Sequence, residues 1–460
     1  MTRTVLTRAA VAAICAAVSL LRGAPDVRAD SPDPAAGPRL RIAFDDVTLA
    51  NGLRLITIED RRAPIVTLAM MVDVGSANEQ PGRTGFAHLF EHLMFQGSAN
   101  VDAGQHSILI ANYGGQSNAM TNTDWTFYFD SVPTNQVDLT LFLNADRMRS
   151  LAISAESFAR EKEVVKEERR MRVDNQPYRR SAFALNELMY DSFAYGHEGI
   201  GSMDDLDASS LEDIRRFFDT YYTAGNTVLV LIGDIDAATA RQKVVKYFGA
   251  LLPRPAPPAA DRTEPRQTTP RRQTVVDVLA PAPRVSLAFK TVPGNHPDYF
   301  ALRVLLAVLQ SGHSSRLYEP LVNQGLATSI SGSLDETRGA GGFYLTADLQ
   351  PGVDSGSAER AIYGEIERLQ DRKIEDWELQ KARSLIGAEI LGDLHRGLIR
   401  ALYIASSTVD FADPQRINTY LDRIGAVTQE DVQRVAREHL RVGNRTVVVT
   451  MPKTAAEGSP

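Results

Sequence analysis

The sequence predicts an α+β protein made of two similar halves, each a mainly antiparallel sheet packed with helices. Strand-like and helix-like segments occur in separate runs, which favours antiparallel sheets. The chain has 460 residues, more than one hydrophobic core usually organises. Both halves close with the same unit: a helix pattern (211–222 and 432–440), a glycine turn and a β-branched strand (228–232 and 446–450). Such units are common, so chance similarity stays an alternative at this point.

The order of elements is clearest in the first half. Residues 42–49 and 53–59 flank Asn51-Gly52, which predicts a β-hairpin with a two-residue turn. Further strands are expected at 65–74, 116–121 and 126–131, and helices at 85–95, 105–113, 136–151 and 155–172.

Composition divides the chain into five parts. Arg3 and Arg8 precede an apolar run at 9–21, and Val27-Arg28-Ala29 offers a cleavage site, so residues 1–29 are expected to be a secretory signal peptide. An uncleaved anchor is the alternative. Residues 30–39 are expected to be a disordered lead, and 253–273, with six prolines, an extended linker. The expected domains are therefore 40–252 and 274–460.

Export limits the chemistry that the mature chain could use. The single cysteine, Cys15, would leave with the signal peptide, so any metal must be held by nitrogen and oxygen ligands. The net charge of −7 would become −10 when four arginines and one aspartate are removed, which argues against nucleic acid as a partner. No later stretch is apolar enough to cross a membrane. In a Gram-negative bacterium the destination would be the periplasm.

The string His88-Leu89-Phe90-Glu91-His92 carries the clearest chemistry. Residues four apart lie above one another on a helix, so both imidazoles project from one face and can share one metal ion. Zinc accepts two imidazoles and one carboxylate with a fourth position open to water. Glu91 is placed to take a proton from that water. Two solvated histidines on a random helix are the alternative.

A third ligand must come from elsewhere, and the predicted helix at 155–172 offers five glutamates. Glu161 and Glu168 are seven apart and share a face, whereas the others alternate with Lys and Arg as on a solvated surface. Spacing alone leaves the choice open. The candidates are Glu156, Glu161, Glu163, Glu167 and Glu168.

These residues carry a family resemblance. The HLFEH string is the inverted zinc-peptidase motif H-x-x-E-H, and its setting resembles the pitrilysin/insulinase family, which includes mitochondrial processing peptidases. The chain is similar to a bacterial member of that group along almost its whole mature length. The matching segments are GRTGFAHLFEHLMFQGS, NGLRLITIED, GGQSNAMTNTDWTFYFDSVP, EKEVVKEERRMRVDNQP, GIGSMDDLDASSLEDIRRF and GNTVLVLIGDID.

The resemblance implies a role for each site residue. A metal-binding glutamate is expected about 76 residues after the second histidine, which selects Glu168 and leaves Glu167 as the neighbour to test. His88, His92 and Glu168 would then bind one zinc ion per chain, with Glu91 as general base and Glu161 as a supporting catalytic carboxylate. On the edge strand QSNAM, Asn118 and Ala119 would flank the scissile bond of an added peptide strand. A polar edge strand that merely resists aggregation is the alternative.

The second half departs from the family pattern. Family members close two homologous halves like a clamshell, and the second half supplies an Arg and a Tyr that grip the substrate carbonyl. Here the Tyr position falls on Thr328 and the Arg position near Leu321 or Val322. Arg316 and Tyr318 have the wrong spacing. A partner, either a homologous subunit in a heterodimer or a second copy in a homodimer, is therefore expected to complete the site.

The function expected from the sequence is a zinc-dependent endopeptidase that hydrolyses short or unfolded peptides. Two alternatives remain: a non-catalytic assembly subunit, and a peptide-binding protein of the same fold. His313, His395 and His439 in the second half are expected to be surface or packing residues.

Overall fold

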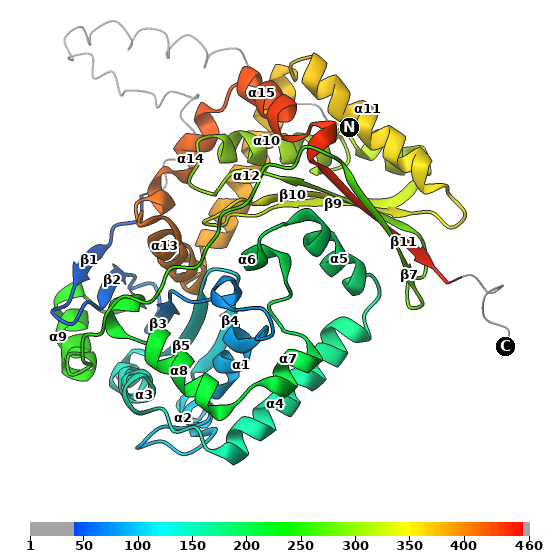
Figure 1. Cartoon of the computed structure of the whole chain (residues 1–460). Helices are drawn as coiled ribbons and strands as arrows, with labels where there is room; N and C mark the ends of the chain where they lie inside the picture. The colour runs from blue at the N-terminus through cyan, green and yellow to red at the C-terminus, as the bar shows by residue number, and fades with distance from the viewer. Residues whose placement is uncertain (1–40, 454–460) are drawn as a thin grey trace, which may run out of the picture. The chain divides into compact units, whose positions relative to one another are not determined.

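The computed structural model describes residues 41–453 and contains two β-sheets with helices packed on them (Figure 1). The predicted signal peptide and the whole of the predicted lead lie outside the described residues. Within the described residues, no helix is long and apolar enough to span a bilayer.

The first sheet has six strands among the described residues, in the order β1-β2-β6-β3-β5-β4. Only β2 and β6 pair in parallel. The strands are β1 (Asp45–Thr48), β2 (Arg54–Glu59), β3 (Ile65–Val72), β4 (Gln116–Thr121), β5 (Thr126–Pro133) and β6 (Thr227–Gly233). The central strands β3 and β6 are buried on both faces, which explains why their sequences are nearly continuous apolar runs.

The second sheet, β7-β11-β8-β10-β9, repeats the order of the first from β2 onward. Its strands are β7 (Arg271–Asp277), β8 (Arg284–Lys290), β9 (Ala327–Leu334), β10 (Gly342–Leu349) and β11 (Arg445–Pro452). Asn226 and Asn444, just before β6 and β11, make equivalent side-chain hydrogen bonds. The Asn226 amide donates to the backbone carbonyls of Tyr221 and Asp73, and the Asn444 amide donates to those of His439 and Lys290. The prediction of two similar, mainly antiparallel halves is confirmed.

The first half contributes nine α-helices among the described residues. They are α1 (Phe86–Leu93), α2 (Gln105–Asn112), α3 (Val137–Ser150), α4 (Ala155–Arg169), α5 (Arg179–Met189), α6 (Phe193–Gly196), α7 (Met203–Ala208), α8 (Leu211–Tyr221) and α9 (Ala237–Phe248). The second half contributes α10 (Asp298–Gln310), α11 (Ser355–Asp371), α12 (Asp376–Leu394), α13 (Gly397–Phe411), α14 (Arg416–Ala426) and α15 (Gln429–His439).

Each half also places a helix on the sheet of the other half. Helix α13 packs against β3, β5 and β6, where Ala401 and Ile404 join a core with Ala69 and Met71. In return, α5 packs against β7, β8 and β11. One large hydrophobic cluster therefore contains residues of both halves, and burying both faces of each sheet requires both halves.

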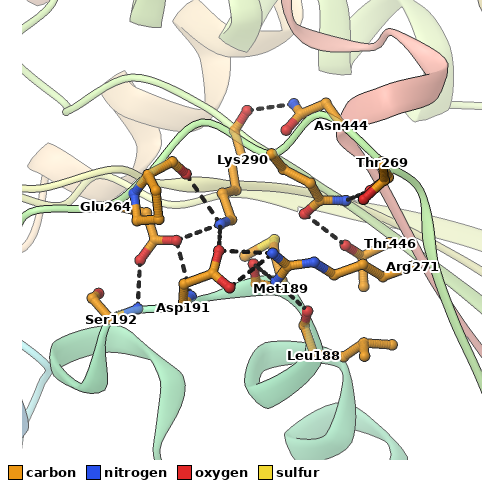
Figure 2. A network of polar contacts seen from close by, with 12 residues as sticks. Leu188, Met189, Asp191, Ser192, Glu264, Thr269, Arg271, Lys290, Asn444 and Thr446 are labelled. Carbon is orange, nitrogen blue, oxygen red and sulfur yellow. Dashed lines mark hydrogen bonds and ion pairs between the residues drawn. The ribbon is translucent and has the colours of Figure 1, made fainter.

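The segment that joins the halves is fixed in place. Residues 253–270 contain no helix or strand, but β7 begins at Arg271, so the predicted linker is three residues too long. The predicted end was wrong because residues 271–273 pair with β11, a contact distant in sequence. Side chains of the segment reach both halves: Arg262 pairs with Asp124, and Glu264 pairs with Lys290 (Figure 2).

The first hairpin corrects a second prediction. Leu49 and Leu53 are hydrogen-bonded across the end of the hairpin, so the loop has three residues, 50–52, and not two. Gly52 has φ +90°, whereas Asn51 does not have positive φ as a two-residue type I′ turn would require. The Asn51 amide instead donates to the carbonyls of Phe248 and Leu251 at the end of α9. A tertiary contact has overridden the local turn preference.

Candidate metal centre

Helix α1 is held by its apolar face. Leu89, Phe90 and Leu93 are fully buried, and the Phe90 ring lies 5.4 Å from that of Phe217 and 4.3 Å from that of Tyr222. His88, Glu91 and His92 consequently occupy the opposite side of the helix, as the spacing predicted.

The start of α1 is anchored by a buried carboxylate. Glu79 accepts hydrogen bonds from the backbone N–H groups of Gly85 (2.9 Å) and Ala87 (2.8 Å), which helix geometry leaves without intrahelical partners. His197 Nε2 lies 2.9 Å from the same carboxylate. Burial raises the pKa of Glu79. Burial lowers the pKa of His197, but the hydrogen bond to Glu79 outweighs it and raises that pKa overall.

Three predicted ligands meet at one point. His88 Nε2 lies 3.7 Å and His92 Nε2 3.3 Å from the same oxygen, Glu168 Oε2. Two ligands of a tetrahedral zinc ion, each about 2.0–2.1 Å from the metal, stand roughly 3.3 Å apart. One ligand atom from each of the three residues lies within 4.8 Å of the others. Spacing and donor types therefore fit a zinc ion.

The charged groups around this point shift one another's pKa values. Burial and the neighbouring charge of His92 lower the pKa of His88 to about 4. Burial lowers the pKa of His92, but the carboxylates of Glu161 and Glu168 outweigh it and raise the value to about 9. The hydrogen bond from His92 lowers the pKa of Glu168. The carboxylate is thus ionised at neutral pH, as metal binding requires.

The remaining acids of α4 separate into two kinds. Glu161 is buried and lies 3.7 Å from His92 Nδ1, where a supporting carboxylate would orient the ring. Glu167 is 57% exposed and pairs with Arg170, so it points away from the histidines. On the far side of Glu168, Arg172 Nη1 lies 2.6 Å from Oε1.

Glu91 stands beside the three ligands and is held by the edge strand. Its Oε2 accepts a hydrogen bond of 2.5 Å from Thr121 Oγ1, at the end of β4. Burial raises the pKa of Glu91, and the Thr121 bond opposes the rise. A carboxylate with a raised pKa is suited to accept a proton near neutral pH. Sequence reasoning missed Thr121 because its contact spans 30 residues.

The predicted substrate strand is an edge of the sheet. β4 pairs with β5 on one side only, and Asn118 is exposed on it. Asn118 Oδ1 accepts a hydrogen bond from the backbone N–H of Ala119 at 2.9 Å. The Asn118 side chain therefore satisfies a backbone N–H of this edge strand, which is one way in which exposed edges avoid pairing with other chains.

A cavity of about 400 Å³ lies at the metal centre and is lined by His88, Thr121 and Glu168. Its walls also include Tyr195 and His197, which sequence reasoning did not single out. No local motif marks these two, because α6 reaches the cavity only through the tertiary fold.

In the second half, the residues at the predicted Arg and Tyr positions do not form a clamp for a substrate carbonyl. Leu321 is buried, and Thr328 lies on the outer strand β9, where its hydroxyl donates to the carbonyl of Asp348. Arg316 makes a two-pronged pair with Glu378, both bonds 2.7 Å, and Tyr318 stacks on His313.

A second group of metal-type side chains lies in this half. It consists of Asp298, Glu438 and His439. Arg434 Nη2 lies 2.8 Å from Asp298, and its Nη1 lies 3.4 Å from Glu438. An arginine already supplies the positive charge, so the group is an ion-pair cluster.

Two protein-family models match the chain. A family model described as "Insulinase (Peptidase family M16)" matches residues 54–200, and one described as "Peptidase M16 inactive domain" matches residues 209–386. The relative named zinc protease PqqE of Helicobacter pylori is 30% identical over 412 residues, 89% of this chain and 93% of the relative.

Two solved structures are similar over 90% and 91% of this chain. A protease from Helicobacter pylori superimposes with a TM-score of 0.85 at 29% identity, over 90% of this chain and 100% of that one. The periplasmic protease PqqL from Escherichia coli gives a TM-score of 0.76 over 91% of this chain but only 49% of its own. At 17% identity, that second likeness concerns the fold alone.

Proposed function

The chain belongs to the insulinase family of peptidases, M16, and on that premise we propose that it is a zinc-dependent endopeptidase acting on short or unfolded peptides. The observation that carries the proposal is the convergence of His88, His92 and Glu168 on one point with Glu91 beside them.

Each side chain has a part in the proposed chemistry. Zinc held by His88, His92 and Glu168 would supply Lewis acidity to polarise a scissile carbonyl and acidify water. Glu91 takes the proton from the attacking water and later delivers it to the leaving amine. The raised pKa of Glu91 favours both transfers, and Thr121 fixes the direction of its carboxylate.

The proposed substrate adds as a strand to the edge of β4. The peptide would replace Asn118 Oδ1 at the Ala119 N–H and pair along a strand that ends at Thr121, next to Glu91. Main-chain pairing requires an extended segment, which favours short or unfolded chains over folded proteins.

We further propose that a homologous partner, in a hetero- or homodimer, supplies the missing carbonyl clamp. Arg316 is committed to Glu378, and this chain matches only half of the Escherichia coli protease. Size-exclusion chromatography with activity measured across the peak tests this, and full activity in a monomer peak contradicts it. We also propose export to the periplasm, tested by identifying Asp30 as the N-terminal residue of the mature protein.

A peptide-library digest read by mass spectrometry tests the central proposal. Wild-type protein, with its partner if one co-purifies, should cleave peptides, and a zinc chelator should abolish cleavage. Glu91→Gln removes the base and spares the ligands, so hydrolysis should fall by about 10²–10⁴-fold while zinc is retained. Glu167→Gln is the matched control, because that carboxylate is exposed and paired with Arg170. Zinc-loaded protein that binds peptides but cleaves none would favour the peptide-binding alternative.

A further inference from the structure

A second cavity, separate from the metal centre, lies where the joining segment meets the second half. It measures about 540 Å³ and shares no lining residue with the cavity at His88. Its walls come from residues 264–267, the end of β8, the end of α15 and the turn that precedes β11. The charged and titratable residues of its lining are Glu264, Arg266, Lys290, Glu438, His439 and Arg441.

One lysine on this wall is fully compensated. Lys290 Nζ lies 2.8 Å from Asp191 Oδ2, pairs with Glu264 and donates to the carbonyl of Pro265 at 3.3 Å (Figure 2). Asp191 is also held by Arg271, through bonds of 2.8 and 2.7 Å. Two cations thus face two carboxylates, and the three ammonium donors of Lys290 are all used.

Two arginines on the same wall are not compensated. Neither Arg266 nor Arg441 forms an ion pair with any residue in the range 41–453. Arg441 donates to the carbonyl of Gln267 at 2.9 Å, while its Nε is buried without a partner among those residues. The nearby acid Glu438 faces Arg434, at 3.4 Å. Burial, together with the charge of Arg266, lowers the pKa of Arg441, as expected of two like charges held close together.

The cavity wall therefore carries two guanidinium groups without an ion-pair partner among the described residues, in a protein whose net charge is −7. Thr291 also lines the cavity, but its Oγ1 is buried beside Gly341, so this hydroxyl does not reach a ligand in the cavity.

We propose that this cavity binds a phosphate-type oxyanion between Arg266 and Arg441. Guanidinium groups bind tetrahedral oxyanions through paired N–H donors. A dianion compensates both arginines, whereas a single carboxylate would compensate one. The volume exceeds that of inorganic phosphate, so the phosphoryl group of a larger small molecule also fits. The site is independent of peptide hydrolysis.

Isothermal titration calorimetry of the full chain with inorganic phosphate tests the proposal. Ionic strength is held constant with sodium chloride, and the titration is repeated with phosphoserine and with acetate. Phosphate should bind saturably, phosphoserine at least as tightly, and acetate at least tenfold more weakly. Stronger binding by phosphoserine would indicate a phosphoester as the ligand, and equal binding would indicate the free ion. Saturable binding of acetate but not phosphate overturns the oxyanion assignment.

Matched variants locate the site. Arg441→Gln should weaken phosphate binding about tenfold or more, the equivalent of losing one charged hydrogen bond. Arg266→Gln, at an exposed position, should do the same without affecting folding. Arg372→Gln is the control, because Arg372 is also exposed but lies on another helix end. Unchanged affinity in both wall variants, or no saturable binding by the wild type, refutes the site.

Discussion

Replacing Arg338 with methionine should destabilise the joint between the two halves. Arg338 lies in the β9–β10 connection, with Nε 2.9 Å from Asp410 Oδ1 on α13 and Nη2 2.5 Å from Asp73 after β3. Its backbone N–H donates to Asp124 at 3.2 Å. The side chain is 16% exposed and that of Asp410 only 5%, so the ion pair is largely shielded from water.

The magnitude follows from what the substitution leaves behind. Among residues 41–453, Asp410 would keep only the indole N–H of Trp125, at 3.2 Å, as a neutral donor. Removing one partner of a buried ion pair costs about 3–5 kcal/mol. Arg372→Met is the control, because that exposed arginine should change stability by less than about 0.5 kcal/mol.

The loss of stability caused by Arg338→Met should be smaller at low pH than at high pH. Burial, opposed by Arg338, raises the pKa of Asp410 to about 7. This exceeds the roughly 3.9 of an unfolded aspartate, so the contribution of Asp410 to stability is full below about pH 4 and is lost as pH rises through 7. Without Arg338 the pKa of Asp410 in the folded protein rises further. The variant should therefore lose about 1–2 kcal/mol less at pH 5.5, where Asp410 is protonated, than at pH 8.5.

Urea unfolding followed by tryptophan fluorescence measures this directly. The chain has two tryptophans: Trp125 is buried at the joint, whereas Trp377 is 56% exposed. Asp410→Asn in the Arg338→Met background should recover much of the loss at pH 8.5, because the uncompensated charge is gone. A variant as stable as wild type at pH 8.5, or a loss unchanged by pH and by Asp410→Asn, would refute the reasoning.

Two further predictions concern the metal centre. Thr121→Val removes the hydrogen bond to Glu91, so kcat should fall about tenfold or more while the zinc content stays unchanged. Steady-state kinetics and metal analysis measure the two quantities. An unchanged kcat would exclude a positioning role for Thr121. Glu161→Gln should weaken zinc affinity about 10–100-fold without abolishing it, because Glu161 contacts His92 and not the point that the three ligands share. Competition with a chelating dye measures the affinity. Complete loss of zinc would make Glu161 a ligand.

Local patterns predicted most of the first half from sequence. The runs of β3 and β6 are strands buried on both faces, and the apolar side of α1 fixed where His88 and His92 point. The repeated closing unit correctly indicated two halves with the same strand order. These features depend on residues a few positions apart.

Contacts between distant segments could not be predicted in this way. Amphipathic patterns show that α5 and α13 have an apolar face, but not that each covers the sheet of the other half. Spacing left Glu161, Glu167 and Glu168 as alternatives, because the approach of α4 to α1 decides among them. Thr121 and His197 carry no local signal at all.

The zinc content of the purified chain tests the central claim most directly. After dialysis with zinc and removal of excess metal, plasma mass spectrometry should find about one zinc per chain in wild type and in Glu91→Gln. Glu168→Ala should bind almost none while circular dichroism shows a retained fold. Wild-type protein without zinc, or a Glu168→Ala variant that keeps a full equivalent, would contradict a metal centre built from α1 and α4.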